Sequence, residues 1–351
     1  MKKIFFIHSV ALYSFRTTIM MLRCLFLLLV ITALTFSSCN ESIPVPKVAK
    51  AVYVAGTEGN VAKYWNNGIA TSLSDGTNLT LATSIFVKGS DVYVAGIEVL
   101  GGGSSVAKYW KNGIVTDLSL SDGTTSGEAN SIFVHGSDVY VAGTDEGVAV
   151  LWKNGIATAL SDAGGTAHAV FVKGSDVYVA GSHGVHARYW KNGIGTNLTD
   201  GTNNASAHAI FVSGSDVYFA GGNYPGNVTI DAVYWKNGIM TVLPDDGGYA
   251  HAESIFVVGS DVHVTGWDGT SSKAAYWKNG VRTILSADDD ETASGESIIV
   301  HGSDVYVAGY DNGAAVIWKN GTPIYLTDGT ESASANSIFV KELAIADSFT
   351  E

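Results

Sequence analysis

The chain has 351 residues, of which 46% are hydrophobic and 15% charged, and its 33 acidic residues outnumber 20 basic ones. Four of the basic residues and no acidic residue lie within residues 1–38, so the rest of the chain has a formal charge near −17. This acidic balance argues against nucleic acid and anionic membrane surfaces as partners. Because the two cysteines are Cys24 and Cys39, the chain beyond them has neither disulfides nor thiolate metal ligands.

Residues 1–38 have the layout of a signal peptide. Basic residues precede a strongly apolar run that starts at Leu25, and small residues stand directly before Cys39. This segment resembles the lipobox of bacterial lipoproteins, although Phe36 stands where that family usually has leucine. The resemblance implies that Cys39 is lipidated and that residues 39–48 are a tether. It also implies a location in the bacterial cell envelope, facing the periplasm or the exterior.

Two alternatives concern this N-terminal region. An uncleaved transmembrane anchor would need an upstream extension, because the apolar run alone is too short to span a bilayer. The leader is also longer than usual, and Met20 or Met21 followed by Arg23 would serve as an ordinary start.

The tetrapeptide Trp-Lys-Asn-Gly, or once Trp-Asn-Asn-Gly, recurs through the rest of the chain. It opens at Trp65, Trp110, Trp152, Trp190, Trp235, Trp277 and Trp318. Consecutive tryptophans are 45, 42, 38, 45, 42 and 41 residues apart. This period is typical of four-stranded propeller blades rather than of helical or leucine-rich repeats.

Each repeat is expected to contain four strands, which we name a to d in chain order. Residues 131–134 and 138–143 are rich in β-branched and aromatic residues around a Gly-Ser turn, which predicts an a–b hairpin. Residues 107–110 and 114–118 predict strands c and d, joined by Asn-Gly, whose positive φ angles suit a type I′ turn. The b–c and d–a loops are longer and irregular. In an up-and-down meander they share one face, where function is expected.

The two ends of the repeat region complete each other. Residues 51–56 are a b strand without its a partner, and residues 337–340 are an a strand without its b partner, so pairing them closes a ring and removes exposed sheet edges. Over residues 49–341 the pattern resembles the β-propeller superfamily, with residues 342–351 as a tail. We therefore expect an all-β fold, a seven-bladed propeller of four-stranded blades. Strand b is similar to the second strand of NHL-type blades, which implies that strand a is innermost. A frame with strand c innermost is the alternative.

The repeated residues have a structural explanation. A tryptophan fixed on every strand c predicts packing between blades rather than a sugar-stacking platform. The aspartates of the Gly-Ser-Asp turns are expected to bond nearby backbone rather than calcium. The Asp-Gly-Thr loops lack the ligand spacing of an EF-hand loop, so turn chemistry is expected there too.

One polar position differs between repeats, two residues before the first Ile or Val of strand a. In ring order it holds Asn336, Thr83, Asn130, His168, His208, Glu253 and Glu296. With strand a innermost, these side chains would surround the channel mouth on the variable face. Two imidazoles and two carboxylates on consecutive blades suit Zn²⁺ or another divalent cation, so His168, His208, Glu253 and Glu296 are candidate ligands. The alternative is a wet channel mouth where any polar residue suffices.

Aromatic residues that are not repeated fall on the same blades. Directly after the glycine near the end of strand b, only two neighbouring blades carry an aromatic residue, Trp267 and Tyr310. Predicted variable loops of adjoining blades add Tyr224, Tyr249, His183, His186 and His251, with acidic residues at 245–246 and 288–290. Exposed aromatics beside carboxylates suit a carbohydrate or a cationic peptide segment. Loop variation without a role is the alternative.

The sequence favours a ligand-binding or protein-interaction module of the envelope, with a carbohydrate or an envelope protein as partner. Motifs of serine hydrolases, zinc proteases and phosphate-binding loops are absent from the sequence, so catalysis is not expected. Two alternatives are a structural subunit of an envelope complex and a propeller hydrolase or lyase acting on carbohydrate. In the latter, Glu253 and Glu296 would be the acid and base pair.

Overall fold

The computed structural model describes residues 50–343, apart from 119–125, 228, 271 and 287–291. The predicted signal peptide, Cys39, the tether, the acidic run 288–290 and nearly all of the predicted tail lie outside the described residues. None of the described segments is a helix long and apolar enough to cross a bilayer.

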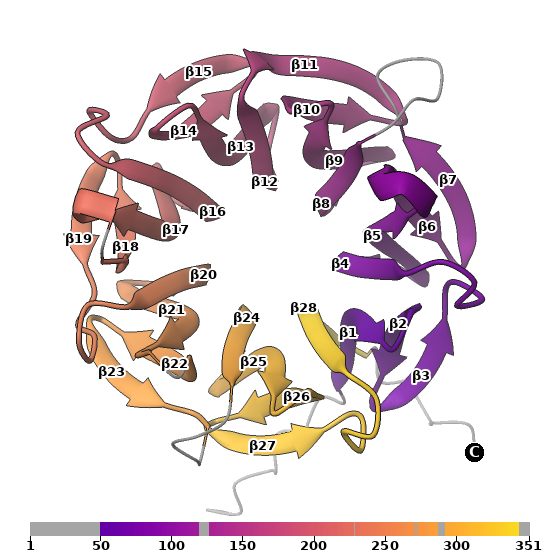
Figure 1. Cartoon of the computed structure of the whole chain (residues 1–351). Helices are drawn as coiled ribbons and strands as arrows, with labels where there is room; N and C mark the ends of the chain where they lie inside the picture. Colours follow the sequence, from indigo (N-terminus) through magenta and orange to yellow (C-terminus); the bar gives the residue numbers. More distant parts are fainter. Residues whose placement is uncertain (1–49, 119–125, 228, 271, 287–291, 344–351) are drawn as a thin grey trace, which may run out of the picture. The chain divides into compact units, whose positions relative to one another are not determined.

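The described residues form seven antiparallel sheets of four strands, arranged as the blades of a ring (Figure 1). The innermost strands are β4 (Thr80–Lys88), β8 (Gly127–His135), β12 (Gly165–Lys173), β16 (Asn204–Ser213), β20 (Ala250–Val258), β24 (Ala293–His301) and β28 (Ala333–Glu342). The second strands are β5 (Asp91–Val99), β9 (Asp138–Asp145), β13 (Asp176–His183), β17 (Asp216–Tyr224), β21 (Asp261–Asp268), β25 (Asp304–Asp311) and β1 (Lys50–Glu58). The expected seven-bladed propeller is therefore confirmed.

The outer half of each blade begins with the strand that carries the repeated tryptophan. These third strands are β6 (Ser105–Lys111), β10 (Val148–Lys153), β14 (His186–Lys191), β18 (Asp231–Lys236), β22 (Lys273–Lys278), β26 (Ala314–Lys319) and β2 (Val61–Asn66). The outermost strands are β7 (Ile114–Leu118), β11 (Ile156–Ala163), β15 (Ile194–Asn197), β19 (Ile239–Val242), β23 (Val281–Ile284), β27 (Thr322–Tyr325) and β3 (Ile69–Ser72). Two short 3₁₀ turns, η1 (Gly101–Gly103) and η2 (Pro225–Asn227), lie in b–c loops.

The first and last strands close the ring. β1 pairs with β28 along its whole length, with Val54 opposite Ile338 and Lys50 opposite Glu342. The predicted closure is therefore confirmed. The β4, β8 and equivalent strands are innermost in Figure 1, so the alternative frame with strand c innermost is wrong.

The core lies between the blades. All seven repeated tryptophans are 0–2% exposed, as expected for packing residues. Trp235 of β18, for example, belongs to the same buried cluster as Tyr178 of the preceding blade and Ile210 of its own innermost strand. Alanines such as Ala180 are fully buried beside them, because small residues let neighbouring sheets approach closely.

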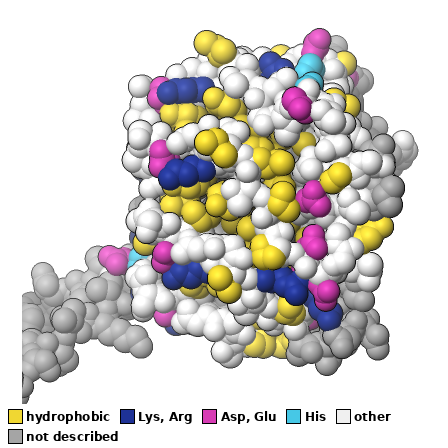
Figure 2. Space-filling view, turned by 90° about the vertical axis from the view of Figure 1, so that its left-hand side faces the viewer, with side chains coloured by type: hydrophobic (Ala, Val, Ile, Leu, Met, Phe, Trp, Pro, Cys, Tyr) yellow, Lys and Arg dark blue, Asp and Glu magenta, His cyan; other side chains and the backbone are white. Residues whose placement is uncertain are grey.

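On six of the seven blades a repeated aspartate joins the a–b turn to the c–d turn, on the face opposite the b–c and d–a loops. In one blade Asp176 accepts hydrogen bonds from Asn192 Nδ2 at 3.0 Å and from Lys191 at 2.7 Å, and Lys191 also lies over the Tyr178 ring. Asn192 has φ 51° and accepts a bond from Val177 N–H, which fits the predicted Asn-Gly turn. The aspartates therefore bond the neighbouring turn, not their own backbone as expected. In Figure 2 such lysine and acidic pairs repeat along one edge of the molecule.

The loops on the opposite face vary less than the sequence suggests. Four of the seven b–c connections are two-residue turns, such as residues 59–60 between β1 and β2. The expected irregularity is therefore confined to the other three b–c loops and to the d–a loops. In the loop after β3, Asp75 accepts a bond from the Thr77 N–H at 2.9 Å, in agreement with turn chemistry.

Candidate functional site

Each innermost strand contains one β-bulge at the same place. In β12, Ala167 pairs with Gly181 and Ala169 with Ala180, so His168 between them has no partner. The seven bulge residues are Asn336, Thr83, Asn130, His168, His208, Glu253 and Glu296. A bulge re-aims a side chain out of the regular pleat. The variable polar position of the sequence is therefore the bulge position of every blade.

The repeated glycine of strand b faces this bulge. A Cβ on Gly181 would lie 1.9 Å from the carbonyl oxygen of Thr166, at the start of the bulge. The equivalent glycines would meet the same clash at 1.9–2.1 Å; they are Gly56, Gly96, Gly143, Gly221, Gly266 and Gly309. The glycine is therefore required by a close approach of two backbones.

Three bulge residues fasten neighbouring blades together. Asn336 donates to the carbonyl of Ala82 at 2.9 Å, and Thr83 donates to that of Ala129 at 2.6 Å. Asn130 continues the series with a bond of 3.1 Å to the carbonyl of the next blade. On these three blades the bulge side chain therefore has a structural role, because it bonds the backbone of the next blade.

A second ring of hydrogen bonds runs beside the bulges. The residue after the bulge is a serine on five blades, and its hydroxyl accepts a bond from a backbone N–H of the next blade, as Ser84 does from Ile132 at 3.1 Å. The other four are Ser131, Ser254, Ser297 and Ser337. The two remaining blades carry Ala169 and Ala209, directly after the two histidines. The two blades with histidine at the bulge are therefore also the two that lack the serine.

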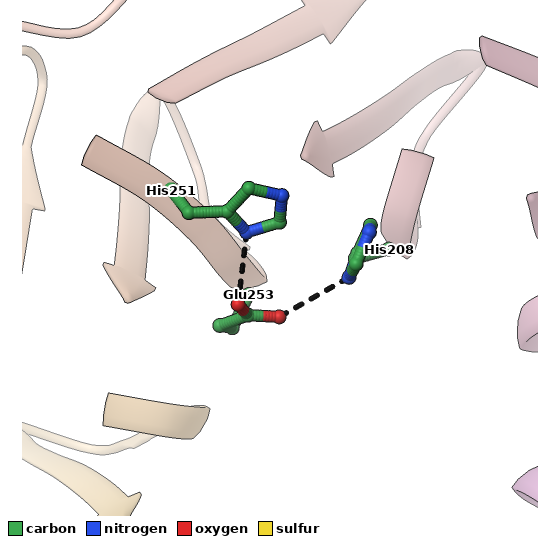
Figure 3. Close-up of side chains that lie close together, drawn as sticks. All are labelled: His208, His251 and Glu253. Atoms are coloured by element: carbon green, nitrogen blue, oxygen red, sulfur yellow. Dashed lines mark hydrogen bonds and ion pairs between the residues drawn. The ribbon is translucent and has the colours of Figure 1, made fainter. Parts of the chain in front are cut away.

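Figure 3 shows two imidazoles that converge on one carboxylate there. Glu253 Oε1 lies 2.8 Å from Nδ1 of His251, and its Oε2 lies 3.2 Å from Nδ1 of His208. The His168 ring stacks on the His208 ring, with centroids 4.4 Å apart and planes 17° from parallel. We call His168, His208, His251, Glu253 and Glu296 the His–Glu arc.

His251 is the member that sequence analysis did not assign to the polar ring. It was expected in a variable loop, but it lies in β20, two residues before Glu253, and is only 4% exposed. Tyr224 of the preceding blade lies with its hydroxyl 3.2 Å from His251 Nε2. The available signal was the His-x-Glu spacing, because residues two apart on a strand point to the same side.

The predicted aromatic residues of these blades lie against the arc. The Trp267 ring is nearly parallel to that of His251, with centroids 6.1 Å apart. Burial raises the pKa of Tyr310, and the charges of Glu296 and Glu253 raise it further. The structure therefore gathers the predicted His168, His208, Glu253 and Trp267 around His251, with Tyr310 and Glu296 in electrostatic contact.

Two other histidines singled out from the sequence have separate partners. His183 lies 2.7 Å from the exposed Asp162, and His186 lies 3.1 Å from the carbonyl oxygen of Thr199. Both histidines were expected in variable loops, but His183 ends β13 and His186 begins β14, and neither contact includes an arc residue.

Burial and neighbouring charges shift the pKa values of the arc residues in different directions. It lowers the pKa of His168 to about 3, with repulsion from His208 adding to the effect, so this imidazole is neutral at physiological pH. Burial alone would raise the pKa of Glu253, but the hydrogen bonds from His208 and His251 outweigh it and hold that pKa below its usual value. Burial and the charge of Glu253 raise the pKa of Glu296 to about 7. The arc thus contains one ionised carboxylate and one carboxyl group that titrates near neutrality.

An apolar ring lies further along the same strands. The rings of Phe339, Phe86, Phe133, Phe171, Phe211 and Phe256 follow one another with centroids 4.6–5.5 Å apart. Each comes three residues after a bulge residue, on the side of the a–b turns. The polar arc therefore lies toward the face of the variable loops.

Two hollows lie elsewhere on the ring. One of about 400 Å³ is lined by residues that include Glu98, Lys108 and Trp110. Another of about 230 Å³ is lined by residues that include Tyr276 and Trp318. Neither includes an arc residue, and both open beside the repeated tryptophans that every blade carries.

Comparison with known proteins supports the fold. No protein-family model and no curated protein matches the chain. Among solved structures it is similar to a Bacteroides fragilis protein that bears the provisional name 6-phosphogluconolactonase, with 12% identity, a TM-score of 0.51, and coverage of 85% of this chain and 100% of that one. It is also similar to the structure of a nidogen/laminin complex, with 11% identity, a TM-score of 0.41, and coverage of 83% and 98%. The first of these likenesses, at 12% identity, shows the fold alone, and a propeller fold is consistent with a binding role.

Proposed function

We propose that this chain is a ligand-binding module of the bacterial cell envelope, anchored by a lipid on Cys39, and that the His–Glu arc contacts its ligand. The observation that supports this is the loss of scaffold bonds on one part of the ring. Asn336, Thr83 and Asn130 fasten blades together, whereas the four bulge residues that follow are His, His, Glu and Glu. Sites where a repeat breaks its own structural rule are expected to be functional.

The path of the chain supports a ligand site that faces away from the membrane. Lys50, where the described chain starts, donates to the carbonyl of His301, the last residue of β24 at its a–b turn. The chain thus enters β1 on the turn face, whereas the bulge residues lie nearer the opposite face. A lipid-anchored chain would thus join the propeller on the face that lies away from the arc.

The side chains at the arc favour a carbohydrate as the ligand. Trp267 and Tyr310 offer partly buried aromatic rings, and the arc supplies carboxylate and imidazole groups that bond hydroxyls. Sugars present both an apolar ring face and hydroxyl groups, so they match this combination.

Two measurements test the proposal. The first is membrane fractionation of wild type and Cys39→Ser, where we expect the variant to leave the membrane fraction. The second is a glycan array probed with wild type, Trp267→Ala and the control Tyr325→Ala, whose tyrosine is 54% exposed on the outermost strand β27. Binding lost only in Trp267→Ala supports the arc. Equal binding by all three, or none by wild type, would overturn a carbohydrate site there.

A carbohydrate hydrolase is a second candidate. Its support is the difference in pKa between two carboxyl groups on neighbouring blades. Glu253 stays ionised, whereas the pKa of Glu296 is raised to about 7. Such a pair is what acid and base catalysis needs. Release of reducing sugar by wild type, lost in Glu296→Gln, would favour this candidate over simple binding.

A structural subunit of an envelope complex is supported by the outer strands. The residue after each Asn-Gly turn is an exposed Ile or Val on six blades, with 70–75% of its surface accessible: Ile69, Ile114, Ile156, Ile194, Ile239 and Val281. Figure 2 shows hydrophobic side chains on this side of the molecule between the charged pairs. Their even spread around the ring forms no single patch, which makes this the weaker candidate.

A further inference from the structure

We propose that His208, His251 and Glu253 bind one divalent transition-metal ion, with Zn²⁺ as the best match. This inference deepens the proposed function of the same arc, because it names a cation that a ligand would meet there. One ligand atom from each of the three residues lies within 4.8 Å of the others. The three side chains come from two neighbouring innermost strands, β16 and β20, which the closed ring holds at a fixed separation.

The distances between donor atoms fit a small cation. Nδ1 of His251 and Nδ1 of His208 lie 2.8 Å and 3.2 Å from the oxygens of Glu253. Tetrahedral Zn²⁺, with bonds of about 2.0–2.1 Å, places its ligand atoms roughly 3.3 Å apart. The ion would replace the two hydrogen bonds, and the most widely spaced pair of the three ligand atoms would have to draw together from a distance of at most 4.8 Å.

The chemistry of the donors selects the type of metal. Two imidazoles and one carboxylate suit Zn²⁺ and neighbouring transition metals, whereas Ca²⁺ and Mg²⁺ prefer sites made of oxygen atoms. The carboxylate of Glu253, which both imidazoles approach, supplies a negatively charged oxygen ligand. Three protein ligands also leave one tetrahedral position for water or for a ligand atom.

Surrounding residues hold the imidazoles in place. The Tyr224 hydroxyl bonds Nε2 of His251, which directs the opposite nitrogen, Nδ1, to Glu253. Such outer contacts fix the orientation of a metal-bound histidine. The Trp267 ring lies nearly parallel to the His251 ring, with centroids 6.1 Å apart, and His168 stacks on His208.

This set differs from the four ligands expected from the sequence. Within the part of the chain that the structure describes, His168 meets the cluster by stacking and makes no hydrogen bond to Glu253. Glu296 is not part of the group whose ligand atoms lie within 4.8 Å of one another among the described residues. His251, held by Tyr224 and hydrogen-bonded to Glu253, takes their place as the third ligand.

Zinc titration of the full-length chain in detergent, stripped with EDTA, tests the inference. ZnCl₂ alone is the probe in calorimetry, and CoCl₂ reports tetrahedral coordination by visible absorption. We expect one ion per chain, with affinity reduced at least 100-fold in His208→Ala, His251→Ala and Glu253→Gln. The matched control His183→Ala, which removes an imidazole bound to exposed Asp162, should keep wild-type affinity.

A milder variant keeps the test valid where an alanine variant fails to fold. Tyr224→Phe removes only the outer hydrogen bond, and we expect it to weaken zinc binding about 10-fold with an unchanged circular dichroism spectrum. Absence of binding by wild type would overturn the inference, as would binding that survives in all three ligand variants. Glycan binding by the stripped protein would leave the proposed function standing without the metal, so the two failures are distinguishable.

Discussion

The imidazole of His251 lies against the α carbon of Gly222, so close that a Cβ there would be 2.6 Å from the ring atoms Cδ2 and Nε2. Gly222 is the residue after the repeated glycine of strand b. Other blades carry a side chain at this position, and in two of them it is Trp267 or Tyr310. The absence of a side chain on β17 therefore makes room for the third imidazole of the arc.

Gly222→Ala is expected to displace the His251 ring. The new methyl group meets a side chain rather than backbone, so the ring can rotate away, at a cost of about 1–3 kcal/mol in unfolding free energy. Rotation would break the bonds to Glu253 and Tyr224 and weaken zinc binding. Urea denaturation and calorimetry measure the two effects. Gly101→Ala is the control, since none of the described residues other than its chain neighbours lies within 4 Å of the added carbon. Unchanged zinc affinity in Gly222→Ala would contradict this account.

Gly181→Ala is expected to be more severe, because its Cβ would meet the backbone oxygen of Thr166 at 1.9 Å. Backbone held between two strands cannot rotate away, so the bulge at His168 must open. We expect a loss of about 3 kcal/mol or more in unfolding free energy. Thermal denaturation beside Gly101→Ala measures it. A melting temperature equal to that of the control would show that the glycine is not required by the bulge.

The fold was predictable because the chain repeats it. Trp190 with Asn192 marks the third strand and its turn, and six further copies of this motif give the period. A strand that is hard to assign in one repeat can therefore be assigned from the equivalent strands of the others. The strand order followed from the unpaired ends at 51–56 and 337–340. The partner of Asp176 was missed, because Asn192 lies in the neighbouring turn and reaches it only after the blade has formed.

The site was predictable only in part. The bulge position was visible as a polar column in the repeats, which led to His208 and Glu253. His251 was expected in a variable loop rather than on the innermost strand, because the equivalent residues of other blades are as different as Leu81 and Glu128. Only packing against Gly222 brings its ring to Glu253. This contact between blades depends on Gly222 of one sheet and the His251 side chain of the next. The two residues are far apart in the sequence, so the pattern within a single repeat does not predict it.

The serine ring predicts opposite effects of two substitutions. Ser84→Ala removes the acceptor of the Ile132 N–H, and we expect it to lower unfolding free energy by about 1 kcal/mol. Ala209→Ser supplies the missing acceptor on a histidine blade, and we expect a gain of similar size. Chemical denaturation of both variants and the double variant measures this. If Ala209→Ser instead destabilises the protein, the alanine is needed for space beside His208.

Glu296 predicts how stability depends on pH in the metal-free protein. Its pKa rises from 4.5 to about 7 on folding, because burial and the charge of Glu253 oppose ionisation. Between these values the folded state holds a proton that the unfolded state has lost, so stability falls as pH rises from about 4.5 to 7, and the loss is complete above 7. Glu296→Gln has no such proton to lose. Relative to wild type it should therefore gain on the order of 2–3 kcal/mol between pH 4 and pH 8. The exposed Glu128→Gln on β8 is the control, and urea denaturation across this range measures the difference. Parallel pH profiles for wild type and Glu296→Gln would mean that Glu296 ionises freely, and its place in the arc would then have to be withdrawn.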